Sequence, residues 1–394
     1  MILLLLLTLS LIGAASYTFR LWNSVRQTPF LLPSPLPTPD SRLPTSVIIP
    51  AYNEAENIEE CIRSVLDSTP LPADAFNVWV VDDQSTDETV AIVQLLQETL
   101  NDPRLNLLLG KPRPAGETWV GKSWACVQGA ETAPGDFLLF IDADVRLGEG
   151  AIEAAVQTAE REQIDLLSCG PAIICGCLAE WIVQPLMFST ILIGFNADVV
   201  NDPKSDKAFA AGPFMLFRRS AYEQIGGHRA VGDQVVEDVA LARLVKQSGL
   251  TLRLLSGIKL ISVRMYRSWQ ALWEGWTKNM FLGSDRNLLS SLLFAALMPL
   301  IFTVPWLALF SSLIQAIFVP LSLDQQLAIV LSLIIISIHF LMRKILLEAG
   351  DFPPRYWWLA GVGGVLISAI TLASIIKTET GWGWTWRGRS LKQF

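Results

Sequence analysis

Hydrophobic residues along this chain gather in short runs and in long runs, and the two predict different structures. Short runs alternate with helical patterns between residues 45 and 283. Ser46–Pro50, Val78–Val81 and Phe137–Ile141 have the length and the β-branched or aromatic character of buried strands. Strands that alternate with helices predict a single α/β domain with a doubly wound, mostly parallel sheet. The ligand of such a sheet lies at the carboxyl ends of its strands.

The long apolar run at the start of the chain predicts a membrane helix. Residues 2–19 carry no charged side chain and approach the length of about 20 residues that spans a bilayer. We expect residues 1–19 to be a retained transmembrane anchor. A cleaved signal peptide is the alternative, but the basic start and the clear cleavage site of such a peptide are missing. Arg20 and Arg26 after the anchor favour a cytoplasmic location for the bulk of the chain.

A second set of long apolar runs lies near the other end of the chain. From Leu288 to Met342 the only formally charged residue is Asp324. This stretch predicts two spans, near 289–318 and 327–342, and a third span fits at 356–376.

We therefore assign residues 284–376 to transmembrane helices and residues 377–394 to a basic, tryptophan-rich tail. Three spans leave that tail on the outer side, against the positive-inside tendency. Either Pro299 and Pro305 break the first stretch into a hairpin, or one span does not cross.

Two further segments have their own character. Residues 20–44 form a proline-rich linker, because six prolines fall between Pro29 and Pro44 and keep the chain extended. Residues 178–200 are apolar but interrupted by polar residues and a proline. We interpret them as a helix lying in the membrane interface, with a transmembrane span as the alternative.

Composition supports a membrane protein and narrows its partners. The 394 residues are 51% hydrophobic with a mean hydropathy of +0.41, which is too apolar for an ordinary soluble chain. The net charge of −7 argues against nucleic acid as a partner. Five cysteines without a regular framework fit a reducing compartment, and Cys169, Cys175 and Cys177 lack the spacing of a zinc site.

Asp142 and Asp144 follow the apolar run that ends at Ile141. Residues two apart in an extended segment share a face, so both carboxylates point the same way. Paired hard oxygen ligands beside a cleft suit Mg²⁺ or Mn²⁺, with phosphate oxygens completing the shell. A solvated pair of turn acids is the alternative interpretation. Lys122, after Gly121, could add a cation near the same phosphates or could lie on the surface.

Two other strand ends carry candidate donor-binding residues. Asp82 and Asp83 follow Val78–Val81 and can accept hydrogen bonds from a base edge and from ribose hydroxyls. Helix capping is the alternative, and we expect it for Asp87 and Glu88. The turn at the end of the first strand exposes backbone donors and a tyrosine face through Pro50, Ala51, Tyr52, Asn53 and Glu54.

Taken in order, these motifs resemble those of the family 2 glycosyltransferases, which have the GT-A fold. The matching motifs are Pro50-Ala51-Tyr52-Asn53-Glu54, Asp82-Asp83-x-Ser85-Thr86-Asp87, Gly121-Lys122, Asp142-x-Asp144, Gly226-Gly227-His228 and Glu237-Asp238. Each motif is weak by itself, and the ordered combination is specific. A chain that retained this fold as a non-catalytic scaffold would have eroded acids, and none is seen.

The resemblance implies a role for each matching position. Asp82 or Asp83 holds the nucleotide of the donor, and Asp144 with Asp142 holds the metal. Asp238, beside Glu237, is the catalytic base that takes the proton of the acceptor hydroxyl. The two acids also lie at the start of a predicted helix, where the helix dipole favours negative charge.

The rest of the chain resembles membrane-anchored members of the family that act on lipids. Those members include the carotenoid glycosyltransferases of the diaponeurosporenoate and myxol types, the hopene-associated enzymes and, more distantly, ceramide glucosyltransferase. The residues that carry this likeness are Arg264-Met265-Tyr266-Arg267, Gly275-Trp276-Thr277-Lys278-Asn279 and Thr385-Trp386-Arg387-Gly388-Arg389.

One segment departs from the pattern of processive members, which usually read Gln-x-x-Arg-Trp near the leaving diphosphate. Here Arg264 replaces the glutamine, and Ser268 separates Arg267 from Trp269. The departure argues for a single transfer and against a polysaccharide synthase. Arg264 and Arg267 could clamp phosphates bidentately, and Trp269 either contributes to the donor site or packs at the interface.

The sequence thus predicts an integral membrane glycosyltransferase with a cytoplasmic GT-A domain at residues 45–283. It would use Mg²⁺ or Mn²⁺, invert the anomeric centre and move one sugar from a nucleotide-sugar donor to a lipid acceptor in the bilayer. A carotenoid such as a myxol-type 2′-hydroxyl is the favoured acceptor, and a hopanoid or glycolipid is the alternative.

Overall fold

The computed structural model describes residues 1–33 and 44–391 and divides into two compact units. The helical unit comprises Met1–Gln27, Cys175–Asn196 and Tyr266–Trp386, and the sheet unit comprises Thr28–Ile174, Ala197–Met265 and Arg387–Phe394. The centre of the expected proline-rich linker and the last three residues of the tail lie outside the described residues.

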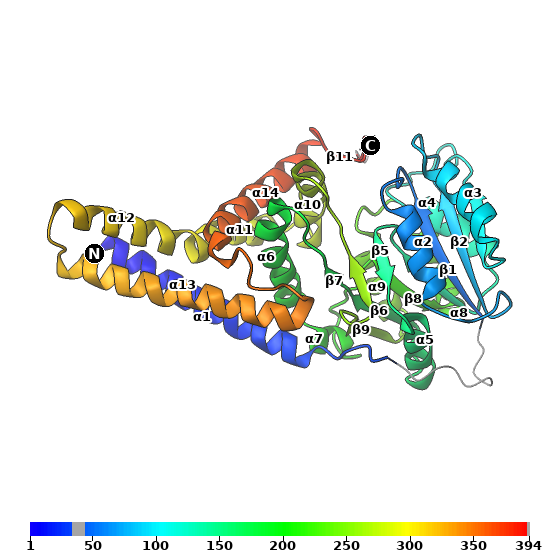
Figure 1. The fold of residues 1–394 in the computed structure, drawn as a ribbon, viewed down its shortest axis with the longest axis horizontal. Coiled ribbons are helices and arrows are strands. Elements are labelled where there is room, and N and C mark those ends of the chain that lie inside the picture. Colours follow the sequence, from blue (N-terminus) through cyan, green and yellow to red (C-terminus); the bar gives the residue numbers. More distant parts are fainter. Residues whose placement is uncertain (34–43, 392–394) are drawn as a thin grey trace. The chain divides into compact units, whose positions relative to one another are not determined.

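The sheet unit is built on one seven-stranded sheet (Figure 1). Its strands, in spatial order, are β3 (Leu105–Leu109), β2 (Phe76–Asp82), β1 (Thr45–Ala51), β4 (Phe137–Ile141), β8 (Phe214–Arg218), β6 (Leu166–Gly170) and β9 (Leu252–Ser256). Only β8 runs antiparallel to its neighbours. The mostly parallel α/β sheet expected from the sequence is confirmed.

Helices cover this sheet in the way that parallel strands require. They are α2 (Ile58–Asp67), α3 (Thr89–Leu100), α4 (Ser123–Thr132), α5 (Ala151–Arg161), α7 (Ala197–Asn201), α8 (Arg219–Gln224) and α9 (Glu237–Gln247). In Figure 1, α2 lies in front of β1 and β2 and packs with α3, while α4 lies against the opposite face of the same strands. All seven residues of β1 are buried, which explains why the strand is a continuous apolar run instead of an alternating one.

A second, three-stranded sheet begins with the strand that follows β4 in the chain. It contains β5 (Val145–Leu147), β10 (Ile261–Val263) and β7 (Ala172–Ile173), with β10 in the centre. Since β5 begins directly after Asp144 and pairs antiparallel with β10, this small sheet fixes the segment that carries the acid pair.

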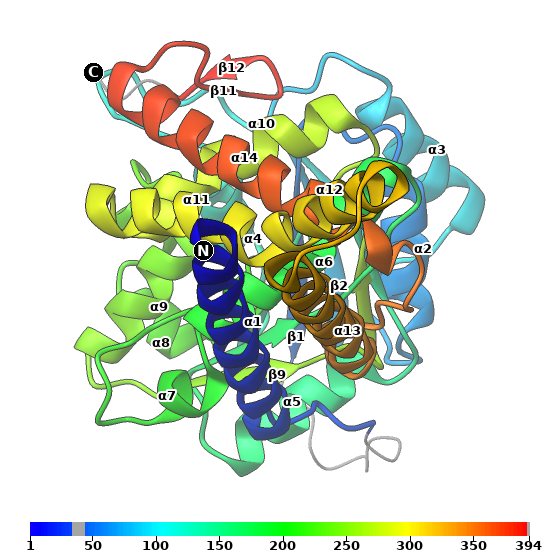
Figure 2. The same cartoon turned by 90° about the vertical axis from the view of Figure 1, so that its left-hand side faces the viewer.

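The helical unit holds the apolar helices. They are α1 (Ile2–Gln27), α6 (Leu178–Gly194), α10 (Trp269–Gly283), α11 (Leu288–Phe302), α12 (Val304–Phe318), α13 (Leu323–Gly350) and α14 (Ala360–Thr380), with a short 3-10 turn η2 (Trp357–Leu359). Figure 2 shows α1 and α13 side by side, and their residues are in contact. The first helix runs past residue 19 to Gln27, into the segment assigned to the linker.

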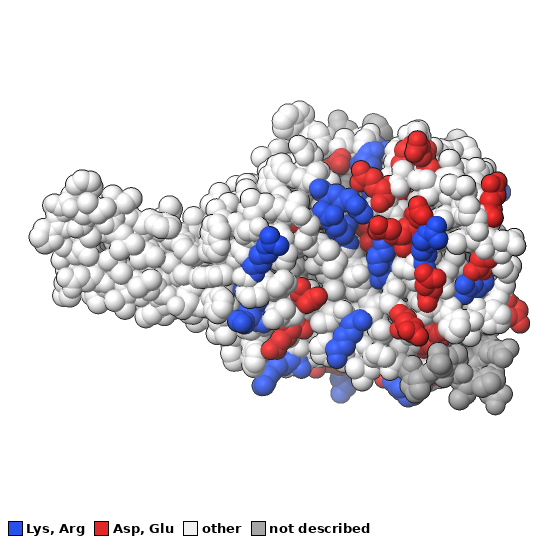
Figure 3. Space-filling view, in the orientation of Figure 1, with Lys and Arg blue, Asp and Glu red and all other residues white. Residues whose placement is uncertain are grey.

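Four helices of the described chain are long and apolar enough to cross a membrane: Ile2–Gln27, Leu288–Phe318, Leu323–Gly350 and Trp357–Thr380. They coincide with the four spans expected from the sequence, and they support membrane association. On the face in Figure 3, no charged side chain appears over α12 and the neighbouring ends of α1 and α13.

The span at 288–318 is not one straight helix. It divides at Thr303, between α11 with Pro299 inside it and α12 with Pro305 in its first turn. Figure 2 shows the two helices running in different directions, with α11 against α14 and α12 against α13. Prolines at these positions remove helical hydrogen bonds, which accounts for the bend.

The segment expected to lie in the interface is also divided. Residues 178–194 form α6, which packs against α1, α10, α13 and α14 within the helical unit, whereas α7 belongs to the sheet unit. The interfacial position of α6 stays a prediction.

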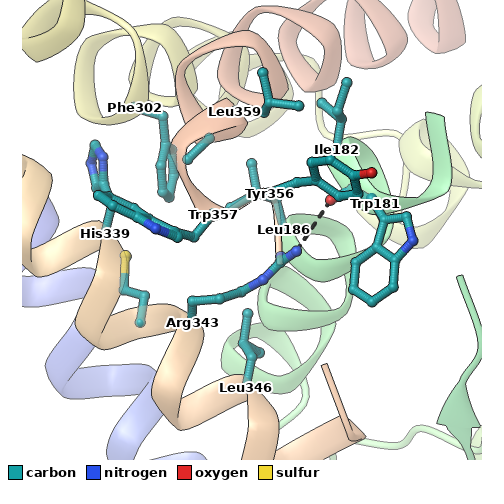
Figure 4. Close-up of a pocket in the computed structure, with 12 residues that line it drawn as sticks. Trp181, Ile182, Leu186, Phe302, His339, Arg343, Leu346, Tyr356, Trp357 and Leu359 are labelled. Atoms are coloured by element: carbon teal, nitrogen blue, oxygen red, sulfur yellow. Dashed lines mark hydrogen bonds between the residues drawn. The ribbon is translucent and has the colours of Figure 1, made fainter. Parts of the chain in front are cut away.

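A small cavity of about 20 Å³ lies in the helical unit between α6, α13 and η2 (Figure 4). The buried guanidinium of Arg343 donates to the carbonyl oxygens of Trp181, at 3.3 Å, and of Arg355, at 2.9 Å. A cavity of this size has room for about one water molecule. Because carbonyl oxygens already satisfy Arg343, we interpret the cavity as part of helix packing.

Candidate functional site

The candidate residues meet at one edge of the large sheet because of strand direction. In the register of the parallel strands Ala51 pairs with Asp82, so the loops after β1 and β2 leave the sheet together. Since β4 is also parallel to β1, Asp142 leaves at the same edge. The antiparallel strand β8 starts there, because Phe214 pairs with Ile141. The sheet therefore places all four segments at one edge, where parallel α/β sheets bind their ligands.

The acid pair lies in a strongly negative part of this edge. Burial, followed by the nearby charges of Asp142 and Glu54, raises the pKa of Asp144 to about 8. Its Oδ1 atom is buried and accepts no hydrogen bond. A buried carboxylate oxygen without a partner beside two other acids is an environment that a cation would stabilise. The residues therefore fit a divalent metal.

The described residues contain no group of three or more His, Cys, Asp or Glu side chains arranged to enclose a metal. A Mg²⁺-type site does not need one, since such ions are commonly held by one or two carboxylates and by substrate phosphates. Asp142 and Asp144 are the two protein carboxylates that would serve here.

Lys122 connects the acid pair to the second acidic motif. The residue immediately precedes α4, and its ammonium group forms ion pairs with Asp142 and, at 3.3 Å, with Glu237. Although burial disfavours the charge, the carboxylates of Asp142 and Glu237 raise the pKa of Lys122 well above its usual range. Lys122 therefore places a cation between the two motifs.

Asp238 is held in place by backbone donors. Its Oδ2 atom accepts from the amide of Gly212 at 3.0 Å, and its Oδ1 atom accepts from the amide of Val239 at 2.8 Å. Burial, followed by the charge of Glu237, raises the pKa of Asp238 to about 7. A carboxylate with a pKa near neutrality is matched to accept and release a proton at physiological pH.

Gly212 allows this close approach. A Cβ atom added there would lie 2.8 Å from Oδ2 of Asp238, closer than real contacts allow. We therefore expect Gly212→Ala to displace the carboxylate and to lower kcat at least about tenfold, since small misplacements of a reacting group are costly. Steady-state kinetics should show the loss in kcat, with the affinity for nucleoside diphosphate unchanged. Gly194→Ala is the control, because a Cβ atom added there meets no atom within 4 Å and should leave kcat unchanged. Gly249 does not serve as a control, because its positive φ would strain any side chain.

The two acids at the end of β2, Asp82 and Asp83, have different environments. The carboxylate of Asp82 accepts from the amides of Gln84 and Ser85, so it closes its own loop as a capping residue does. The carboxylate of Asp83 faces two guanidinium groups, those of Arg113 at 3.3 Å and of Arg389. Of the pair, Asp83 is the one whose carboxylate pairs with cations from other segments.

The loop after β1 is tied to the loop after β2. The amide of Asn53 donates to Ser85 Oγ at 3.0 Å, and Asn53 Oδ1 accepts from the amide of Thr86 at 2.8 Å. Asp87 accepts from the amides of Thr89 and Ala55, as expected for a capping residue, whereas the side chain of Glu88 makes no capping bond to α3. These bonds position Tyr52 and Glu54, the candidate donor-binding residues that follow Pro50 and Ala51 at the end of β1.

Two arginines of the tail join this site, and sequence reasoning did not assign them to it. Arg387 forms an ion pair with Glu54 at 2.6 Å, and the guanidinium of Arg389 lies 3.3 Å from the centre of the Tyr52 ring. Arg113 was also missed, although a basic residue between two prolines shortly after β3 was a signal that could have drawn attention to it.

The segment that departs from the processive pattern is only partly brought to the site. The amide of Arg264 donates to the carbonyl oxygen of Asp144 at 3.4 Å, as the pairing of β10 with β5 requires. Arg267 and Trp269 belong to the helical unit, where Trp269 begins α10 and packs on Trp273. Their donor-site roles stay predictions.

His228 has a structural role. It is 1% exposed, its Nδ1 atom lies 2.9 Å from the Tyr222 hydroxyl, and its ring packs against Phe140. Burial, reinforced by the charge of Lys122, lowers the pKa of His228 to about 3, so the ring is neutral at physiological pH. A left-handed φ of 52° at Gly227, where a side chain would strike Tyr222, explains the glycines before it.

Comparison with known proteins agrees with this geometry. The sequence matches the family described as Glycosyl transferase family 2 over residues 46–226, and Glycosyl transferase family group 2 over residues 137–343. It is 29% identical over 243 residues to a 4,4′-diaponeurosporenoate glycosyltransferase of Staphylococcus haemolyticus (strain JCSC1435), covering 61% of this chain and 62% of that protein. A protein of the same name from Staphylococcus aureus (strain MRSA252) is 30% identical over 242 residues, covering 61% of each chain. The match thus spans less than two thirds of these relatives.

A solved structure supports the fold over nearly the whole length. The mannosyltransferase PcManGT from Pyrobaculum calidifontis, solved in complex with GDP-Man and Mn²⁺, aligns with a TM-score of 0.54 at 19% identity. The alignment covers 96% of this chain and 98% of that one, and it shows a shared GT-A fold. With the two family matches and the motifs gathered at one sheet edge, the chain belongs to the family 2 glycosyltransferases.

Proposed function

We propose that this protein is an inverting, metal-dependent glycosyltransferase that moves one sugar from a nucleotide-diphosphate sugar to a lipid in the membrane. The observation that carries the proposal is the bridge of Lys122 between Asp142 and Glu237, which ties the acid pair to the motif that holds Asp238. A leaving-group site and a base that lie next to each other are what a direct displacement needs.

Asp238 acts as the base. The acceptor hydroxyl attacks the anomeric carbon, its proton passes to Oδ1 or Oδ2 of Asp238, and the bond from that carbon to the diphosphate oxygen breaks with its electron pair on the diphosphate. Attack from the face opposite the leaving group inverts the anomeric centre. The amides of Gly212 and Val239 hold the carboxylate in place for this step.

Asp142 and Asp144 hold the diphosphate end of the donor. A divalent metal at these carboxylates would neutralise the charge that develops on the departing diphosphate. Mg²⁺ and Mn²⁺ both suit oxygen ligands, and PcManGT was solved with Mn²⁺. Lys122 supplies a second positive charge beside the same phosphates.

We propose a carotenoid as the acceptor, with a hopanoid or a glycolipid as the alternative. The support is the resemblance to proteins named diaponeurosporenoate glycosyltransferases and the four apolar helices, which would keep the enzyme beside an acceptor that stays in the bilayer. Because a carboxylate acceptor has no proton to lose, the presence of a positioned base favours a hydroxyl, such as the 2′-hydroxyl of a myxol-type carotenoid. The catalytic domain would then face the cytoplasm, where nucleotide sugars are made.

Mass spectrometry of lipid extracts from cells with and without the gene tests this function. We expect a glycosylated carotenoid to disappear and its aglycone, lighter by one hexose or deoxyhexose, to accumulate. Cells carrying the Asp238→Asn variant should show the same profile as the deletion. A missing hopanoid or glycerolipid glycoside would change the acceptor and keep the transferase, whereas extracts that are identical in every glycolipid class would contradict the proposal.

A further inference from the structure

The last described residues of the chain return to the sheet unit and place two arginines on the donor-binding loops. Arg387 and Arg389 flank Gly388, beside the short strand β12 (Arg389–Ser390). Arg387 and Gly388 have left-handed φ values of 48° and 79°, so the chain turns between the two arginines. The turn sends both side chains toward the loops that follow β1 and β2.

Arg389 holds the residues expected to receive the nucleoside. One guanidinium nitrogen forms an ion pair with the Asp83 carboxylate, and the other donates to the Asp83 carbonyl oxygen at 2.6 Å. The guanidinium also stacks on the Tyr52 ring, 3.3 Å from its centre. A planar cation on an aromatic face fixes the orientation of both groups.

Arg387 holds the loop that follows β1. Its Nη1 atom donates to the carbonyl oxygens of Tyr52 at 2.8 Å and Asn53 at 3.0 Å, and it forms an ion pair with Glu54. Arg387 therefore stands at the edge where the diphosphate of a donor would meet Asp142 and Asp144.

Burial distinguishes these contacts from ordinary surface ion pairs. The carboxylate side chains of Glu54 and Asp83 are only 11% and 7% exposed, and those of Arg387 and Arg389 are 27% and 28% exposed. Exposed pairs contribute little, whereas guanidinium groups held in partly buried sites suit bidentate recognition of phosphate. Two fixed cations offset part of the acids' negative charge at this edge, and so reduce the repulsion that a diphosphate would meet there.

We propose that Arg387 and Arg389 belong to the donor-binding site. Arg387 binds the diphosphate of the nucleotide sugar, and Arg389 is a positioning residue that holds Tyr52 and Asp83 against the nucleoside. This inference rests on the proposed transferase function and adds the C-terminal tail to its substrate site.

Calorimetric titration of the detergent-solubilised full chain with UDP, GDP and dTDP, and with the matching monophosphates, in Mn²⁺ tests the assignment. Arg387→Ala should weaken diphosphate binding at least about tenfold, the effect of losing one charge-assisted bond, and monophosphate binding much less. Arg387→Lys should restore only part of the diphosphate affinity, since an ammonium pairs with phosphate as a point charge but cannot form the bidentate contact. Arg389→Ala should weaken diphosphate and monophosphate alike.

Arg63→Ala is the matched control, because Arg63 forms an exposed ion pair with Glu59 in the same unit and should leave every affinity unchanged. Affinities that stay unchanged in folded Arg387→Ala and Arg389→Ala would make the tail a structural strap and overturn the inference. Tighter binding in either variant would make the tail an inhibitory cover and overturn it equally. A wild-type protein that binds no nucleoside diphosphate in Mn²⁺ or Mg²⁺ would instead contradict the transferase function itself.

Discussion

Asp238→Asn is expected to lower the rate of sugar transfer by about 10²–10⁴-fold, the range that a positioned general base contributes. The amide has the shape of the carboxylate but cannot take the proton of the acceptor hydroxyl. Nucleoside diphosphate should bind nearly as well as in the wild type, because the acid pair and Lys122 remain. Transfer of a radiolabelled sugar and calorimetric titration of the nucleotide separate the two effects.

The pH dependence of the wild type provides the control for this assignment. Since burial and Glu237 raise the pKa of Asp238 to about 7, the base is protonated and inactive at lower pH. The rate should therefore fall as pH decreases through about 7, and the residual rate of Asp238→Asn should lack this limb. A variant that keeps the wild-type rate would show that another group takes the proton.

Loss of the metal, or of the carboxylate that fits it, is the second large effect that we expect. Asp144→Asn and chelation of divalent ions should each reduce transfer at least about 10²-fold, because stabilisation of a developing charge by a metal is worth several kcal/mol. Binding of nucleoside diphosphate should become independent of Mn²⁺ in the variant. Titrations with and without Mn²⁺ after chelation measure this directly.

Thermal unfolding of the metal-free protein gives a readout that does not depend on activity. The pKa of Asp144 is raised to about 8 from an ordinary value of 3.8, so the folded state holds this proton more tightly than the unfolded state does. Stability is therefore fully present at pH below about 4 and is lost as pH rises toward 8. Tm should fall over this window, Mn²⁺ should restore it at pH 8, and Asp144→Asn should be less sensitive to both. Wild-type activity that survives complete chelation would exclude the metal role.

The strands and the acids at their ends were predictable because both rest on local patterns. Fully buried runs such as Phe137–Ile141 indicate parallel strands, and parallel strands bring their following residues to one edge. From these two facts alone Asp83 and Asp142 could be expected near each other. Glu237 and Asp238 came from the family resemblance, since the start of a helix is an ordinary place for acids.

What the sequence could not supply were contacts between distant segments. Arg389 meets Asp83 across 306 positions, and no pattern of composition predicts such a pairing. The hydrogen bonds of Asp82 to its own loop could not be predicted either, because an acid at a strand end can cap the next turn or bind a ligand. The division at Thr303 was only half expected: Pro299 and Pro305 permitted a break, but the helices that pack on each half decide its position.

The return of Arg387 and Arg389 to the sheet unit also limits how the chain threads the bilayer. Residues 44–174 and 387–391 belong to one compact body, so in a membrane-bound protein they would lie on one side of the bilayer. We therefore expect the chain that leaves this body after Met265 and re-enters it at Arg387 to cross the bilayer an even number of times. Three crossings by the three long apolar segments between these points are incompatible with that parity. The bend at Thr303 explains how the segment at 288–318 can fail to cross. At about 1.5 Å per residue, α11 and α12 with 15 residues each are both too short to span a hydrocarbon layer of about 30 Å alone.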